Sequence, residues 1–312
     1  MNDPQHIYRR RRATFLGAIA VVVLGAGVLL GSGGDGAPKR TAAGEAALPP
    51  APPALPRGGR SILPEFRVVA YYGAPQSREL GELGIGSPRS ATQRLLRQAH
   101  PYATKRRPVL PALELITVIA NADGGQDGMY RSRQSDAVIR RYLRAARRAK
   151  ALLLLDIQPG RSDFFTEATR LEKWLEQPDV GLALDPEWHV DAGQVPGQVI
   201  GQVSAREVNA TSAWLAQLVA REKLPEKLFV VHQFTDDMVD ESALKTHDGL
   251  ALVLNVDGFG NQAVKKAKYR DFTRQAPGLR HGFKLFYHED TDMMRPAQVM
   301  RLRPRPFLVV YE

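Results

Sequence analysis

Eight short apolar runs, separated by segments with helical periodicity, limit how this chain can fold. Continuously apolar strands are typical of parallel sheets covered on both faces, whereas a sheet with one wet face alternates apolar and polar residues. Strands that alternate with helices along the chain predict an α/β fold. In chain order, the runs are residues 66–72, 109–118, 151–157, 180–185, 228–233, 250–256, 282–287 and 307–311.

The segments between these runs supply the helices. In residues 135–150, the apolar side chains lie on one stripe and the arginines lie outside it, as in an amphipathic helix. Eight strand–helix units over about 250 residues match the (β/α)8 TIM barrel. The helix after the eighth run is expected to be missing. Helices are expected at 91–99, 135–150, 163–176, 205–222 and 263–274, with short candidates at 236–244 and 296–300.

An open, doubly wound sheet is the alternative architecture. It would carry a glycine-rich phosphate-binding turn after the first strand. The sequence Gly73-Ala-Pro-Gln is not such a turn, so no nucleotide-binding fingerprint is present.

The first sixty-four residues differ from the rest of the chain. A basic block, Arg9 to Arg12, precedes the uncharged residues 13–31. In a helix those residues span about 28 Å, close to the thickness of a bilayer core. This length favours a transmembrane helix or uncleaved signal anchor over a cleaved secretory signal. The expected domains are a cytoplasmic tail (1–12), the anchor (13–31), a disordered Pro/Gly/Ala-rich linker (32–64) and the barrel (65–312).

Charge and composition narrow the localisation and the partners. The basic block is expected to stay in the cytoplasm, which makes the chain a single-pass protein of the cell membrane with an extracytoplasmic barrel, or a secreted one if the segment is cleaved. The formal net charge is +10, and about half of this excess lies in the first sixty residues. The rest is too mild to indicate a nucleic-acid partner. The chain contains no cysteine, which excludes disulfides and thiolate chemistry.

Polar residues end nearly every apolar run. In TIM barrels the reactive groups lie at the carboxyl ends of the strands, so these residues are expected to meet at one mouth. The residues predicted to line a substrate pocket are Tyr72, Glu114, Asp156, Trp188, His232, Gln233, Asp257 and Lys284.

Asp185 and Glu187 form a D-x-E pair after the fourth run. Positions i and i+2 of a strand face the same side, although Pro186 is expected to end the ladder and displace Glu187 slightly. Two close carboxylates raise the pKa of one of them, which yields a proton donor for cleaving a glycosidic bond. We therefore expect Glu187 as the acid and Asp185 as its partner.

This pair resembles the end of the D-x-x-D-x-D-x-E signature of chitinase-like glycosidases and the D-x-E of Chalaropsis-type lysozymes. The resemblance implies that Glu187 donates the proton, that Asp185 orients a substrate N-acetyl group or supports Glu187, and that Tyr287 assists. The sequence departs from the signature at Val180 and Ala183, where earlier aspartates would stand. The body of the chain is also similar to a group of exported actinobacterial proteins. That resemblance does not suggest a particular activity.

The resulting interpretation is a membrane-anchored, glycoside hydrolase-like barrel that acts on a cell-envelope polysaccharide such as peptidoglycan, with no cofactor and no metal. Two alternatives remain open. Asp156, Asp185 or Glu187, and Asp257 could hold Mg²⁺ or Ca²⁺ through oxygen, with Lys284 as a base. The barrel could also bind carbohydrate without cleaving it.

Overall fold

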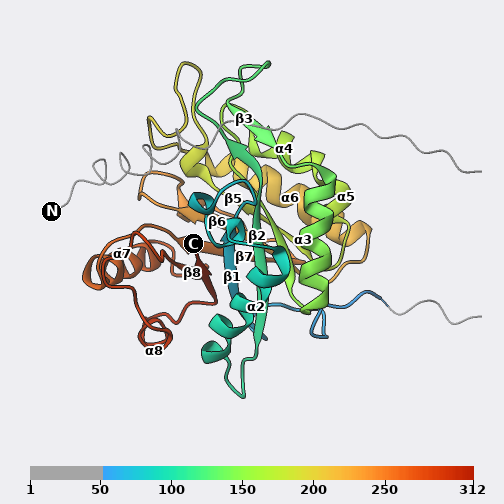
Figure 1. Cartoon of the computed structure of the whole chain (residues 1–312), viewed down its shortest axis with the longest axis vertical. Helices are drawn as coiled ribbons and strands as arrows, with labels where there is room; N and C mark the ends of the chain where they lie inside the picture. Colours follow the sequence, from blue (N-terminus) through green and yellow to red (C-terminus); the bar gives the residue numbers. More distant parts are fainter. Residues whose placement is uncertain (1–51) are drawn as a thin grey trace, which may run out of the picture.

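The computed structural model describes residues 52–312, which form a closed barrel of eight parallel strands (Figure 1). The predictions for residues 1–12 and 13–31 lie outside this range, as does most of the predicted linker. Within the range, no helix has the length and apolar character needed to cross a bilayer. The α/β TIM barrel predicted from the sequence is confirmed.

The barrel closes because β1 pairs with strands on both sides, β2 on one and β9 on the other. Each of the eight predicted runs overlaps one barrel strand. The barrel strands are β1 (Arg67–Gly73), β2 (Val109–Ala120), β4 (Leu152–Ile157), β5 (Val180–Leu184), β6 (Lys227–Gln233), β7 (Leu250–Val256), β8 (Arg280–Leu285) and β9 (Leu308–Tyr311).

Helices follow most strands, close to the predicted ranges. The predicted helix 163–176 divides into two at Leu171, and the candidate at 236–244 is only a 3-10 turn, Glu241–Ala243. The connection from β6 to β7 therefore has no α-helix. The helices are α2 (Pro88–Ala99), α3 (Asp136–Arg148), α4 (Phe164–Arg170), α5 (Glu172–Leu175), α6 (Ala205–Arg221), α7 (Gln262–Gln275) and α8 (Pro296–Val299).

One strand was not predicted. β3 (Arg131–Arg133) pairs antiparallel with the end of β2, so that β2 extends beyond the barrel as a hairpin. Arg131 and Arg133 both bind the buried carboxylate of Glu167 on α4, at 2.8 and 2.6 Å. These ion pairs fix the hairpin to α4.

The core has two apolar layers, because alternate residues of each strand face opposite sides. Outward residues pack against the helices. Inward residues fill the barrel, with small ones where space is tight. Gly282 of β8 is one of these, since a Cβ there would lie 2.4 Å from Asn255 Oδ1 on β7.

The segment before β1 closes the N-terminal end of the barrel. Leu55, Ile62 and Phe66 are buried against the inward side chains of the strands. The Arg57 guanidinium donates to the Val109 carbonyl at 2.9 Å. Residues 55–64, which the sequence assigned to the linker because of their composition, therefore pack as part of the barrel.

Candidate functional site

A buried polar layer fills the C-terminal end of the barrel interior. On β1, for example, Val68 and Ala70 point inward, and the next inward residue is Tyr72. The same alternation on the other strands leads from apolar to ionisable side chains. The residues of this polar layer are Tyr72, Glu114, Asp156, Asp185, His232, Asn255, Asp257, Lys284 and Glu312, and all except Glu312 have at most 2 % of their surface exposed.

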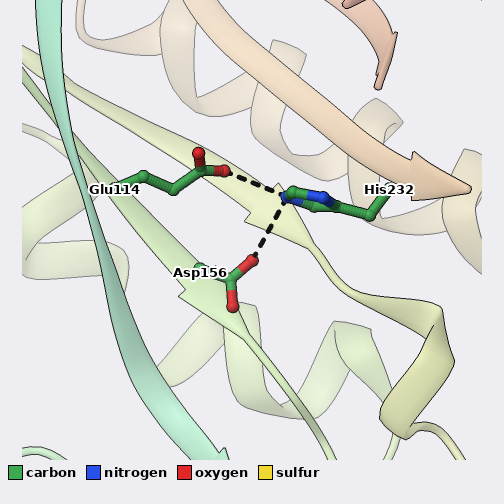
Figure 2. A group of neighbouring side chains, drawn as sticks. All are labelled: Glu114, Asp156 and His232. Atoms are coloured by element: carbon green, nitrogen blue, oxygen red, sulfur yellow. Dashed lines mark hydrogen bonds and ion pairs between the residues drawn. The ribbon is translucent and has the colours of Figure 1, made fainter. Parts of the chain in front are cut away.

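His232, near the end of β6, lies among three carboxylates. Its Nε2 atom is 3.1 Å from Glu114 Oε1 and 3.8 Å from Asp156 Oδ2, and these side chains point toward one another from three strands (Figure 2). On the other side of the ring, Nδ1 is 3.1 Å from Asp257 Oδ2. Burial alone would lower the His232 pKa, but the hydrogen bonds to Asp257 and Glu114 outweigh it and raise that pKa well above its usual value.

Tyr72 connects two of the carboxylates. Its hydroxyl donates to Asp185 Oδ2 at 3.1 Å and lies 3.4 Å from Asp156 Oδ1, and it accepts from the Gln158 amide at 2.9 Å. Burial, followed by repulsion from Asp185, raises the pKa of Asp156 well above its usual value. Burial and the same carboxylates also raise the Tyr72 pKa, so the phenol remains a donor.

Lys284 is the second cationic side chain of the polar layer. Its Nζ atom is 2.9 Å from Asp257 Oδ2 and 2.8 Å from Glu312 Oε2, and it lies over the Tyr72 ring, 4.0 Å from the centroid. Five carboxylates therefore face two cations. Uncompensated buried charge costs several kcal/mol, so this layer favours either a bound proton, as the raised Asp156 pKa indicates, or a bound cation.

Three side chains of the layer are arranged to hold a metal ion. One ligand atom from each of Glu114, Asp156 and His232 lies within 4.8 Å of the others. Among the described residues, Glu114 Oε2 and Asp156 Oδ2 have no hydrogen-bond partner although both are buried. Buried polar atoms are nearly always hydrogen-bonded, so two bare oxygens beside an imidazole fit a cation that would bind them.

Most of the residues predicted from strand ends lie together. Tyr72, Glu114, Asp156, Asp185, His232, Asp257 and Lys284 all belong to the polar layer. Glu187 is buried as well, but it lies in a 3-10 turn, Pro186–Trp188, that ends the strand alternation. The charges of both Asp257 and Glu187 act on the Lys268 ammonium of α7. Trp188 packs beneath the following loop, near Gly197.

The structure separates two predicted residues from the polar layer. Gln233 follows the inward His232 and so faces outward, where its amide donates to Glu241 Oε2 at 3.2 Å. Tyr287 lies between the barrel and α2, where its hydroxyl donates to Gln98 Oε1 and its ring stacks on Tyr311. Both positions follow from strand alternation, which places neighbouring residues on opposite faces.

Sequence reasoning did not select Asn255 or Glu312 as site residues. Asn255 Nδ2 lies 3.3 Å from His232 Nδ1, and Glu312 pairs with Lys284. Leu308 and Val310 of β9 fill the barrel interior, and Glu312 is the next residue in this alternation, directly after the strand. Strand alternation could therefore have predicted Glu312 as a site residue.

Comparisons with known proteins show resemblance in fold alone. No protein-family profile matches the chain, and no curated protein matches it. One similar solved structure is 2,3-dimethylmalate lyase, a PEP mutase/isocitrate lyase superfamily member, with 12% identity, a TM-score of 0.43, and 80% of this chain and 77% of that chain covered. Another is the xylanase and α-amylase inhibitor protein XAIP-II from Scadoxus multiflorus, with 11% identity, a TM-score of 0.45, and 78% and 92% covered. Likenesses this distant carry no inference about chemistry.

Proposed function

We propose that this protein is a metal-dependent TIM-barrel enzyme whose divalent cation is held by Glu114, Asp156 and His232. The observation that supports the proposal most directly is the pair of buried carboxylate oxygens without hydrogen bonds beside an imidazole nitrogen. Carboxylates suit Mg²⁺ and Mn²⁺, whereas imidazole suits Zn²⁺ and other transition metals. The mixed set of ligands therefore favours Mn²⁺, with Mg²⁺ and Zn²⁺ as the ions to compare.

The surroundings of His232 support the same proposal. A histidine that ligates a metal usually donates its other ring N–H to a carboxylate, which fixes the ring and its tautomer. Asp257 lies in this position, 3.1 Å from Nδ1, so that Nε2 faces Glu114 and Asp156. When bound, the cation would act as a Lewis acid that polarises a substrate oxygen. Lys284 and Tyr72 would supply positive charge and a hydrogen-bond donor beside it.

Metal binding tests the proposal directly. The chain is stripped with a chelator, and Mn²⁺, Mg²⁺ and Zn²⁺ are titrated by calorimetry. We expect one Mn²⁺ per chain, with affinity at least about tenfold weaker in Glu114→Gln, which removes a ligand charge but keeps the shape. Glu241→Gln is the matched control, because Glu241 is buried outside the barrel interior. Failure to bind, or equal affinities in both variants, would remove the metal centre from consideration.

A second candidate function is glycoside hydrolysis with Glu187 as the acid. It is supported by the burial of Glu187 and by its electrostatic interaction with Lys268, on which Asp257 also acts. The test is incubation with peptidoglycan and a panel of glycans, comparing the chain with Glu187→Gln. Activity that survives chelation and disappears in Glu187→Gln would favour the hydrolase. Glycan binding without product would favour a binding barrel.

A further inference from the structure

The N-terminal end of the barrel, opposite the polar layer, carries a basic surface formed by three loops. These loops precede β2, β8 and β9, and the sheet order places β8, β9, β1 and β2 side by side. α8, at the lower edge of Figure 1, contacts the turn that precedes the first of these loops. We call this surface the basic face; its residues are Lys105, Arg106, Arg107, Arg280, Arg301, Arg303 and Arg305.

The centre of the basic face is crowded with guanidinium groups. Arg107 and Arg280 both lie over the ring of Phe307, at 4.6 and 5.0 Å from its centroid. Arg67 is buried beneath them and donates to the carbonyls of Pro306 and Tyr102. Burial, and then repulsion from Arg107 and Arg305, lowers the pKa of Arg67 to about 10.

The described part of the chain does not pair this charge with carboxylates. No residue of the basic face forms an ion pair within residues 52–312, whereas arginines elsewhere, such as Arg133 and Arg147, bind carboxylates. In residues 55–66, 100–108, 276–280 and 300–307 the one carboxylate is Glu65. The other acidic residues at this end, Glu176, Asp179, Glu222, Glu226 and Asp248, lie in the loops before β5, β6 and β7, outside the basic face. A concentrated field of a single sign attracts an anionic partner.

The chain enters the barrel at this same end. Leu55, Ile62 and Phe66 pack at that end, and the Arg60 guanidinium donates to the carbonyls of Pro53, Lys223 and Leu224. The described chain therefore begins beside the loop before β6, at the end of the barrel that also carries the basic face and not at the mouth. The sequence predicts a membrane anchor at 13–31, and about twenty residues separate it from residue 52. A disordered linker of that length, as the sequence predicts, has an end-to-end distance of about 25 Å. An anchored barrel would therefore keep this end close to the bilayer.

We propose that the basic face docks on the anionic lipid headgroups of the membrane in which the predicted anchor is embedded. The charge is complementary and the tether supplies a high local concentration. Docking in this orientation turns the mouth, with its polar layer, away from the bilayer. The proposal does not depend on the chemistry of the polar layer.

The test uses the full chain in lipid nanodiscs and a fluorescent reporter of distance to the bilayer. Because the chain has no cysteine, single reporter cysteines can be introduced. Gly278→Cys places one at the basic end, where an added Cβ meets no atom within 4 Å, and Gln126→Cys places one on the exposed loop that joins β2 to β3. We expect headgroup-linked quenchers to quench the first reporter at least twofold more with anionic than with neutral lipids, and only at low salt. The second reporter should not respond.

Matched variants distinguish the effect of the basic face on docking from the effect of the net charge of the chain. One replaces Lys105, Arg106, Arg301 and Arg305 with Gln and should lose the anionic-lipid response. The control replaces four exposed arginines of α3 with Gln and should keep it; both are checked by thermal unfolding. An equal response in neutral lipid, or an equal loss in the control, overturns the proposal. The proposal is also overturned if the chain binds a soluble polyanion while the quenching of its reporter does not depend on lipid charge. The control positions are 140, 141, 144 and 148.

Discussion

Asp257 contacts three groups at once. One carboxylate oxygen lies 3.1 Å from His232 Nδ1 and 2.9 Å from Lys284 Nζ, while the other accepts from the Gly258 amide at 2.6 Å. It therefore couples both cationic side chains of the polar layer to the backbone after β7. In the proposed metal centre it acts as a positioning residue, because it fixes the ring whose other nitrogen faces the ligand carboxylates.

Lys227 gives a prediction about pH that is independent of the site. Its buried ammonium donates to the carbonyls of Gln177 and Val180, and burial lowers its pKa to about 7. The unfolded chain then binds more protons than the folded chain between about pH 7 and 10.5. The cost of burying the charge is full below pH 7 and fades as the pH rises through this window.

We expect the free energy of unfolding of the native chain, relative to Lys227→Met, to increase by about 2 kcal/mol from pH 7 to pH 9. Urea unfolding of both proteins at the two pH values measures this difference. Parallel pH dependence in the two proteins would show that Lys227 titrates normally when folded.

At the scale of elements, the β2–β3 hairpin depends on one buried carboxylate. Glu167 accepts hydrogen bonds from Arg131, Arg133 and Ser162 and has no exposed surface. We expect Glu167→Gln to destabilise the chain by about 1–3 kcal/mol, because it removes the carboxylate charge that pairs with both guanidinium groups and leaves Arg131 only its exposed partner Asp127. Hydrogen exchange should accelerate in residues 120–133. The exposed pair Lys173–Asp136 provides the comparison: Asp136→Asn should cost less than about 1 kcal/mol.

Alternation along strands explains which elements the sequence could predict. The eight apolar runs coincide largely with the eight barrel strands because each strand is buried on both faces. Pro186 was expected to end the ladder and displace Glu187, and β5 does end at Leu184. The 3-10 turn Pro186–Trp188 that follows was not predicted, so the i, i+2 rule does not place Glu187. β3 was too short to leave a pattern. Residues 55–64 read as a linker because a few buried side chains, Leu55 and Ile62 among them, stand among many prolines and glycines.

The candidate site was predictable in part for the same reason. Tyr72, Glu114, Asp156 and His232 continue an inward series of apolar residues, so the strand pattern alone placed them. Lys284 follows Gly282 and the exposed Arg280, so its chemistry at the strand end was the signal. Gln233 and Tyr287 were selected for their chemistry at strand ends, and the alternation that placed the others turns these two outward. The pairing of His232 with Glu114 joins β6 to β2 across the barrel, and no local pattern encodes that distance.

For the whole molecule, the proposed metal should couple to folding. A cation that binds only the folded chain stabilises it by about 2.7 kcal/mol at a hundredfold excess over its Kd. We expect the Tm to rise with Mn²⁺ concentration in the native chain and in Glu241→Gln, and Glu114→Gln to need at least about tenfold more Mn²⁺ for the same rise. A rise of similar size in all three proteins would indicate nonspecific binding to surface carboxylates.

Gly282 in β8 links the packing of the barrel interior to the polar layer. At Gly282 the amide oxygen of Asn255 occupies the space that any larger side chain would need, and that same amide borders His232. One methyl group added there would press Asn255 against the imidazole, two strands from the change. Substitutions that repack the barrel interior to raise thermal stability will therefore also change the surroundings of His232.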